Sequence, residues 1–320
     1  MNLGKVGVVF NGGGFTGAFS VGFAKAIWKN GIKPEIIQGV SVGAISAAKI
    51  LEKGIDELEK TWLEIEKSGA SAIFNWWDVA PNIIKRNSGL FNNSGLMKII
   101  EAIDIRKVVY SPTEFQVTTR NESKGWDLSI FRNHDFKNNP ESFREILRAA
   151  TAIQGGLMPI KIGNERHSDG IQYTLEPMVE AGCDTIFLLL NDQANENQMR
   201  WDQRLSITRN ILHDEYTELY LEKFLREHND FSVIFEEEEN EAMLPIIIQK
   251  MKRAVRSVRS VMSSAAQGDD INFVPHRIFV LHTRTPISTL YTFGFAKGDI
   301  KAAEEQGYDQ ASTLIKKILG

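Results

Sequence analysis

Residues 35–54, "EIIQGVSVGAISAAKILEKG", decide the fold. A short apolar run ends in a Gly-Val-Ser-Val-Gly turn, and small and apolar residues at helical spacing then continue to a glycine that ends a helix. This order predicts a strand, a sharp turn and a helix, with Ser41 in the turn. The pentapeptide alone leaves open whether Ser41 is a nucleophile or a small residue in a tight turn.

The preceding segment repeats the same plan. Residues 5–10, "KVGVVF", form a short β-branched run that ends at "NGGG", and residues 15–31 show helical spacing up to Gly31. Strand, glycine turn, helix, strand, turn and helix therefore follow one another. This alternation predicts a parallel or mixed sheet covered by helices, which is an α/β fold.

The rest of the chain predicts one α/β domain over residues 1–320 with an insertion. We expect paired strands at 113–121 and 125–133, a helix at 140–153, a strand and turn at 159–171, strands at 184–191 and 276–283, and a closing helix at 299–319. Residues 192–274 are charged and predict a largely helical insertion, with an acidic run at 236–239.

Composition excludes several classes of protein. The net charge of −4 gives no basic excess, so nucleic acid is not an expected partner. Cys183, the single cysteine, is interpreted as a small apolar residue entering a buried strand, which suits a reducing compartment. The first residues lead directly into a strand and no apolar run is long enough to span a bilayer. We therefore expect a cytoplasmic protein that meets a membrane only from its surface.

The first glycine turn fits two kinds of ligand. Gly12, Gly14 and Gly17 match G-x-G-x-x-G, and exposed amides at a helix N-terminus favour either a phosphate or an oxyanion. A dinucleotide site also requires an acid at the end of the second strand. Glu35 instead opens that strand and Ser41 follows its end, so dinucleotide binding is the weaker alternative.

The serine turn has the pattern of a nucleophile elbow. Residues two before and two after the serine must be very small so that the strand and the helix can pass each other, and Gly39 and Gly43 meet this requirement. The helix that follows directs its positive end at Ser41. Taken with the glycine turn upstream, the pattern favours a serine hydrolase in which one turn carries the nucleophile and the other the oxyanion donors.

Two kinds of base are candidates for Ser41. His276 or His282 completes a Ser-acid-His order, although the elbow of that fold normally follows more strands than the two seen here. Asp169, beside Gly170 in "RHSDGIQ", is the better candidate because a carboxylate with few water contacts can accept the proton directly. Its ordinary interpretation is an Asp-Gly reverse turn.

Three segments in this order, "NGGGFTG", "GVSVG" and "SDGI", resemble the patatin-like phospholipase family over residues 5–190, and more loosely over 276–320. The resemblance implies a three-layer α/β fold whose central, mostly parallel sheet is flanked by helices. It also implies calcium-independent hydrolysis of lipid acyl esters, as by a phospholipase A or lysophospholipase, with no cofactor and no metal. The implied catalytic dyad is Ser41 and Asp169, the oxyanion hole is Gly12, Gly13 and Gly14, and the motif glycines are Gly17, Gly39, Gly43 and Gly170. The chain departs from the family pattern at Thr16, where a cation is usual, and at Ile171, where a small residue is usual.

Two features bear on access and control. Trp76 and Trp77 suit a membrane interface, and residues 244–262 form a basic amphipathic pattern that suits anionic lipid, but packing against the domain explains both as well or better. A second class of function is also open, in which a partner or small ligand activates the hydrolase through the helical insertion.

Overall fold

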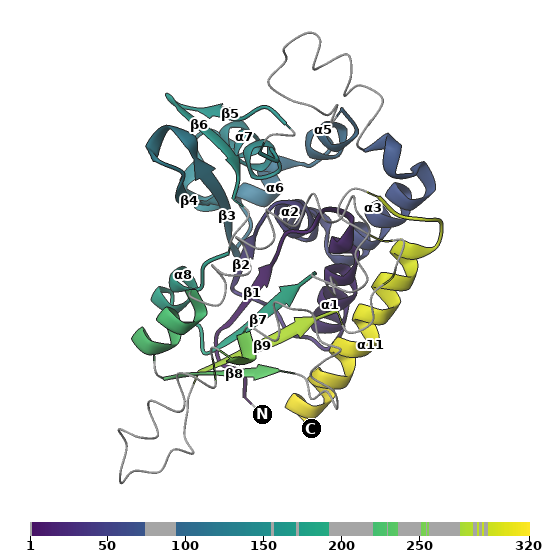
Figure 1. Cartoon of the computed structure of the whole chain (residues 1–320), viewed down its shortest axis with the longest axis vertical. Coiled ribbons are helices and arrows are strands. Elements are labelled where there is room, and N and C mark those ends of the chain that lie inside the picture. Colours follow the sequence, from purple (N-terminus) through teal and green to yellow (C-terminus); the bar gives the residue numbers. More distant parts are fainter. Residues whose placement is uncertain are drawn as a thin grey trace.

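The computed structural model describes residues 2–73, 94–154, 157–170, 173–191, 220–228, 230–235, 251–253, 255, 276–283, 287, 290 and 294–320. Trp76, Trp77, Ile171, the acidic run and most of the pattern at 244–262 lie outside these ranges. Figure 1 shows a sheet at the centre with helices on both faces.

The sheet has nine strands in the described part of the chain, in the order β5-β6-β3-β2-β1-β7-β9-β8, with β4 paired to β3. The neighbouring strands β3, β2, β1, β7, β9 and β8 run parallel to one another. The strands β4, β5 and β6 are antiparallel to their neighbours. Their bounds are β1 Val6–Phe10, β2 Ile36–Gly39, β3 Glu114–Asn121, β4 Asp127–Arg132, β5 Ile160–Ile162, β6 Glu165–Asp169, β7 Thr185–Leu190, β8 Phe231–Phe235 and β9 His276–His282.

The helices vary from single turns to more than twenty residues. The 3-10 turns are η1 Gly14–Gly17, η2 Ala70–Ala72, η4 Glu122–Lys124 and η5 Asn133–Phe136, and residues 220–227 are helical. The other helices are α1 Ala18–Lys29, α2 Val42–Lys53, α3 Ile55–Ser68, α5 Ser94–Glu101, α6 Ile105–Val109, α7 Pro140–Ala150, α8 Glu176–Glu180 and α11 Asp299–Leu319.

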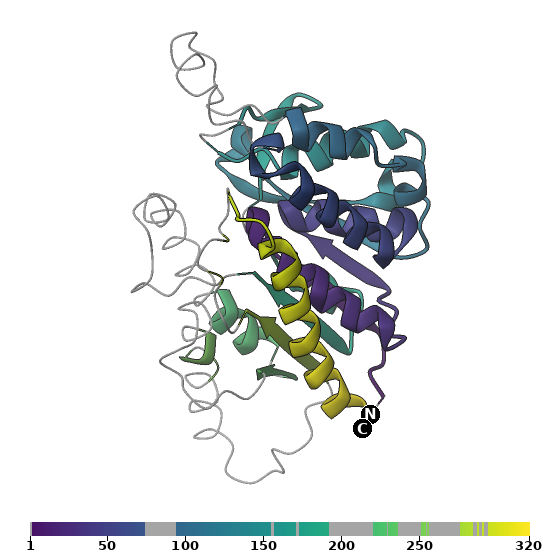
Figure 2. The same cartoon turned by 90° about the vertical axis from the view of Figure 1, so that its right-hand side faces the viewer.

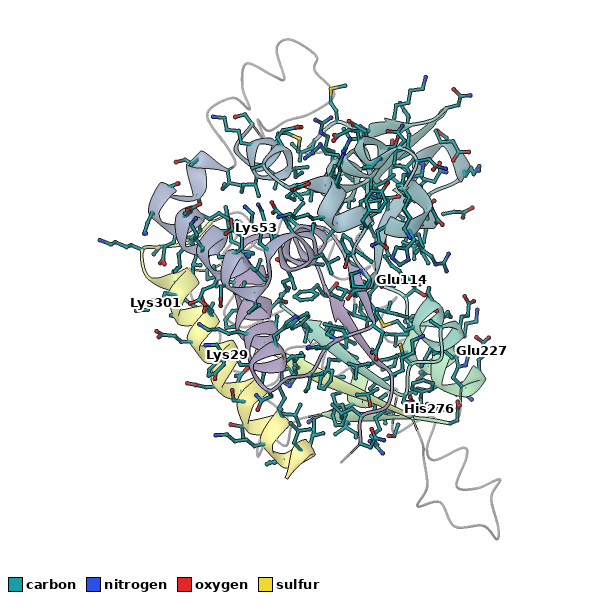
Figure 3. All side chains as sticks on the ribbon, turned by 180° about the vertical axis from the view of Figure 1, so that it is seen from behind. Lys29, Lys53, Glu114, Glu227, His276 and Lys301 are labelled. Atoms are coloured by element: carbon teal, nitrogen blue, oxygen red, sulfur yellow. The ribbon has the colours of Figure 1, made fainter. Side chains whose placement is uncertain are left out.

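Each central strand is buried on both faces because its side chains alternate between two cores. In β1, Val8 and Phe10 join the core under α1, α2, α7 and α11, whereas Val9 joins the core under α8 and residues 220–227. Helices α1 and α11 lie side by side on the first face (Figure 2), and Lys29 of α1 reaches the ring of Tyr308 on α11 (Figure 3). The expected three-layer α/β fold with a mostly parallel sheet is confirmed.

The segment 192–274 contributes one strand to this sheet. Most of the segment lies outside the described residues, but β8 at Phe231–Phe235 pairs with β9, where the charge pattern predicted helix. Phe231 and Val233 are buried in the second core, so packing against the sheet accounts for the strand. The division into a single domain with an insertion stays a prediction.

Candidate active site

Ser41 lies between β2 and α2 in a backbone conformation that non-glycine residues seldom adopt. Its φ is 54° and its ψ is −128°, and the N–H of Gly43 and of Ala44 close the turn on Val40 and Ser41. The strain holds the side chain at the N-terminus of α2, where the helix dipole favours negative charge. This is the geometry of a nucleophile elbow.

The glycines on either side of Ser41 are required by close backbone contacts. A Cβ atom on Gly39 would lie 2.4 Å from Cα of Ala44, and one on Gly43 would lie 2.3 Å from the carbonyl oxygen of Phe10. The strand β1, the turn and the start of α2 therefore pass one another only because both side chains are absent. Gly17 has a related role, since a Cβ atom there would lie 2.9 Å from the side chain of Val42.

The variant Gly43→Ala is expected to destabilise the protein by about 1–3 kcal/mol or more, because the added carbon meets main-chain atoms that have no room to move. Thermal unfolding followed by circular dichroism measures the change. Gly31→Ala is the control: its φ of +76° carries a penalty of about 1 kcal/mol, but nothing lies within 4 Å of the added carbon. Equal losses in the two variants would contradict the steric explanation.

Asp169 reaches Ser41 through the register of three neighbouring strands. Gly39 of β2 pairs with Val117 of β3, and two residues further along β3 Thr119 pairs with Asp169, the last residue of β6. Ser41 lies two residues beyond Gly39, so its hydroxyl arrives beside the carboxylate and donates a 2.6 Å hydrogen bond to Oδ2. The structure thus brings together two residues that are 128 positions apart in the chain.

Asp169 is the last residue of β6. Its side chain is buried and its N–H donates to the carbonyl of Ala152 at 2.9 Å, which fixes it from the side of α7. Gly170 does not have a positive φ; it is required because a Cβ atom there would lie 2.6 Å from the carbonyl oxygen of Thr118. A reverse turn that begins at Asp169 would include residues 171 and 172, which lie outside the described residues, so that interpretation is not tested.

The glycine turn presents its amides on one side because side chains hold its carbonyls on the other. Nδ2 of Asn191 donates to the carbonyls of Asn11 (3.0 Å) and Gly12 (3.2 Å), and the hydroxyl of Thr16 donates to that of Gly13 (2.9 Å). In a trans peptide the N–H points away from the C=O. The N–H groups of residues 12, 13 and 14 therefore point away from these anchors, and no described residue accepts a hydrogen bond from them.

The turn passes directly against the elbow. A Cβ atom on Gly12 would lie 3.1 Å from Cβ of Ser41, so only glycine lets the two turns come this close without crowding. Gly13 and Gly14 have positive φ values of 140° and 60°, which directs their amides as a short run of exposed donors. Amide donors beside a serine hydroxyl are the arrangement that an oxyanion hole requires.

Asn191 was not foreseen from the sequence as a site residue. It is buried at the end of β7, and its Oδ1 accepts a 2.6 Å hydrogen bond from the hydroxyl of Ser20 on α1. The available signal is a polar residue directly after a fully apolar strand, at the edge of the sheet where the carboxyl ends of parallel strands meet. Thr16, noted as a departure from the family pattern, likewise holds the turn with its hydroxyl instead of supplying a charge.

The histidines do not approach Ser41. His276 begins β9 and so lies at the end of the sheet opposite the elbow (Figure 3), beside Asp184 and Asp230. His282 ends β9, which β1 and β7 separate from β2, so three strand spacings of about 4.8 Å lie between them. A triad through either histidine is therefore a wrong expectation.

The requirements of a dinucleotide site are not met either. Glu35 accepts a 2.8 Å hydrogen bond from the N–H of Val6, the first residue of β1, whereas the glycine turn follows the last residue of that strand. The acid is therefore at the wrong end of the sheet to hold a ribose. Cys183 is buried as expected, and burial raises the pKa of its thiol to about 12, which keeps it protonated and unreactive.

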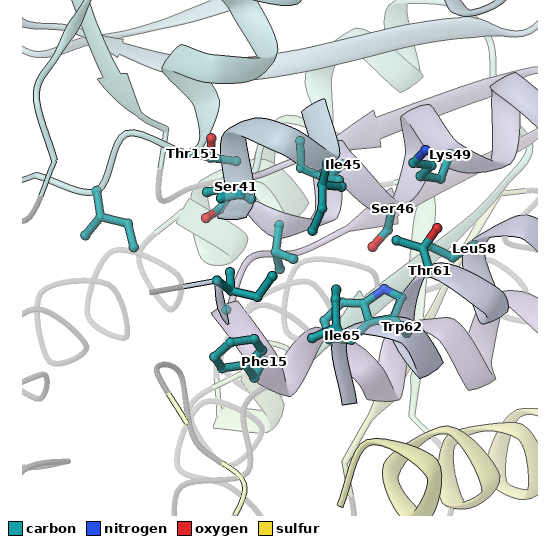
Figure 4. A pocket seen from close by; sticks show the side chains of 16 residues that line it. Phe15, Ser41, Ile45, Ser46, Lys49, Leu58, Thr61, Trp62, Ile65 and Thr151 are labelled. Atoms are coloured by element: carbon teal, nitrogen blue, oxygen red, sulfur yellow. The ribbon is translucent and has the colours of Figure 1, made fainter. Parts of the chain in front are cut away.

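An apolar pocket opens beside Ser41 and extends between α2 and α3 (Figure 4). The cavity has a volume of about 50 Å³ for the centres of water-sized probes, so it is a narrow space. The walls are mostly aliphatic, with polar groups only at Ser41, Ser46, Lys49, Thr61 and Thr151. The apolar walls come from Phe15, Val42, Ile45, Leu58, Trp62, Ile65, Ile73, Leu96, Ile99 and Ile153.

Comparisons with known proteins identify a family whose model matches the part of the chain that contains the site. The model of the family described as "Patatin-like phospholipase" matches residues 8–172, about half of the chain, and this range includes the glycine turn, the elbow and Asp169. Among solved structures, VipD from Legionella pneumophila is similar with 12% sequence identity and a TM-score of 0.45, over 99% of this chain and 67% of that one. No curated protein matches the chain.

Proposed function

The chain belongs to the patatin-like phospholipase family, a family of lipid acyl hydrolases. We propose that Ser41 and Asp169 form a catalytic dyad that hydrolyses the acyl ester bond of a lipid substrate. The observation that carries this proposal is the 2.6 Å hydrogen bond from the strained serine to a buried carboxylate. A nucleophile within hydrogen-bond reach of a positioned base is the arrangement that covalent catalysis requires.

The proposed reaction has two halves. Asp169 accepts the proton of Ser41 as Oγ attacks the ester carbonyl, and the carbonyl oxygen becomes an oxyanion held by the amides of Gly12, Gly13 and Gly14. Each well-placed amide contributes about 3 kcal/mol to the stability of this transition state. Asp169 then returns the proton to the leaving alcohol, and water repeats the sequence on the acyl-enzyme. No step requires calcium.

The pocket supports an acyl chain as the group next to the reacting carbonyl. Ser41 lines the pocket and its other walls are mostly apolar, so an acyl chain gains free energy by leaving water when it enters. The substrate class is therefore an acyl ester of a lipid, as in a phospholipase A or lysophospholipase reaction. None of the helices in the described ranges is long and apolar enough to cross a bilayer. Contact with a membrane surface stays a prediction, as do a cytoplasmic location and activation by a partner or small ligand.

A fluorophosphonate probe tests the proposal directly. The probe phosphonylates an activated serine, and digestion followed by mass spectrometry identifies the labelled peptide. We expect a single modification at Ser41, prevented by prior incubation with a hydrolysable ester. Labelling at another serine, or no labelling of a folded sample, would reject the assignment.

The variants His276→Gln and His282→Gln are expected to keep kcat/KM for an ester substrate within about threefold of the wild type, because neither ring is near Ser41. Steady-state hydrolysis measures this, with thermal unfolding as the check on folding, since His282 is buried. A loss of about a hundredfold or more in a folded variant would indicate a histidine base and contradict the dyad.

A further inference from the structure

The apolar pocket has a charged group at its inner end. Along α2, Ser41, Ile45 and Lys49 follow at intervals of four residues, so they lie on one face of the helix and all line the pocket. In Figure 4, Ser41 lies at one end of the pocket and Lys49 at the other, with Ile45 and Ser46 between them. A lysine is an unusual wall for an acyl chain.

Lys49 is held in a buried ion pair. Its ammonium lies 3.1 Å from Oε2 of Glu52, and both side chains are about 95% or more buried. The other carboxylate oxygen, Oε1, accepts a 3.0 Å hydrogen bond from the N–H of Asp104, at the start of α6. Burial acts to raise the pKa of Glu52, but the Asp104 amide and the Lys49 ammonium outweigh it and the pKa is lowered. Glu52 therefore carries its negative charge at neutral pH.

We propose that Lys49, held in place by Glu52, is the floor of the acyl pocket and limits the substrate to esters of medium-chain acids. This inference rests on the proposed function. Lys49 follows Ser41 by eight residues, which is about 12 Å along a helix. A saturated chain with bonds of about 1.5 Å and angles of about 111° advances about 1.25 Å per carbon. The space from the nucleophile to the floor therefore takes an acyl chain of roughly eight to ten carbons.

A longer chain would have to displace the ion pair or leave its end outside the pocket. Displacing the pair would leave charges without their partner in a buried site, which is strongly unfavourable. On the side of α3, the wall residues Leu58 and Trp62 are themselves buried core residues, so an acyl chain cannot pass there without displacing them. The chain-length limit is thus a property of α2 and α3, separate from the atoms that perform the reaction.

The test is a series of p-nitrophenyl esters from acetyl to palmitoyl, presented in mixed detergent micelles to the full-length protein. We expect kcat/KM to rise from acetyl to octanoyl or decanoyl and to fall by about tenfold or more at palmitoyl. The variant Lys49→Ala/Glu52→Gln removes both charges and opens the floor. It is expected to raise the palmitoyl-to-octanoyl ratio of kcat/KM by about tenfold or more.

Two further variants make the result specific. Ser46→Leu fills the middle of the pocket and is expected to move the preferred chain below octanoyl. The control Lys25→Ala/Glu304→Gln removes an ion pair of the same kind between α1 and α11, outside the pocket, and is expected to leave the profile unchanged. Thermal unfolding of each variant shows whether it is folded.

A wild-type enzyme that hydrolyses palmitoyl and octanoyl esters equally well would overturn the inference. A folded Ser46→Leu variant with an unchanged profile would also overturn it, even where the double variant at 49 and 52 does not fold. These failures are distinct from failure of the proposed function. The proposed function fails if the folded wild-type protein neither hydrolyses any ester nor is labelled at Ser41. In that case the inference on chain length loses its basis as well.

Discussion

Replacing Ser41 with alanine is expected to lower kcat for ester hydrolysis by about 10⁴-fold or more, and to abolish fluorophosphonate labelling. In the proposed mechanism the hydroxyl forms the acyl-enzyme, so its removal eliminates the covalent route and leaves only binding and the proposed oxyanion donors. Because Ser41 has a φ of 54°, alanine keeps the same backbone strain, and the unfolding temperature is expected to change little. Steady-state rates of hydrolysis of a short-chain ester measure the change in kcat.

The matched control is Ser232→Ala on β8, at the other side of the sheet, which is expected to retain full activity and labelling. A Ser41→Ala enzyme that still turns over the ester, at a rate above that of a mock preparation, would exclude Ser41 as the nucleophile. It would leave the family assignment and the fold in place.

Asp169→Asn is expected to lower kcat by about 10³-fold or more while leaving KM within a few-fold. The amide keeps the size of the carboxylate but cannot accept the proton of Ser41, so the hydrogen bond remains in place while the base is lost. Steady-state kinetics on one ester gives both constants. The variant is also expected to react with the fluorophosphonate far more slowly than the wild type.

The control for this variant is Asp127→Asn, an exposed carboxylate on β4 in the same antiparallel part of the sheet. It is expected to match the wild type in both constants. If Asp169→Asn retained more than about a tenth of the wild-type kcat, the base would have to be another group.

The sequence predicted the local units of the fold better than their assembly. Strands at 5–10 and 35–38, each followed by a glycine turn and a helix, are visible because apolar periodicity and small residues are local signals. The strand β8 was missed because "FSVIF" is a short apolar run among charged residues, and only its pairing with β9 makes it a strand. Propensity gives little information on a segment whose stability comes from a distant partner.

The residues of the site likewise fall into those that a local sequence pattern reveals and those that depend on the assembled fold. Ser41 and its two glycines can be identified from one pentapeptide, whereas Asp169 was favoured as the base from its Asp-Gly pattern together with the two upstream motifs and the family resemblance. Its distance from Ser41 depends on the register of β2, β3 and β6, which no local pattern specifies. Asn191 and the buried Lys49 were missed for the same reason, because each acts through contacts that exist only in the folded chain.

The hydrogen bonds that Asn191 makes to the glycine turn and to Ser20 have a consequence for how this protein can be regulated. One side chain ties the glycine turn after β1 to the end of β7, and through Ser20 to α1, so the turn cannot change its shape without disturbing the central layer. The turn that carries Ser41 is likewise confined by the close backbone contacts at Gly39 and Gly43. A regulator therefore has little freedom to change the geometry around Ser41. We expect regulation to act instead on the access of the ester to the pocket and on the release of the product.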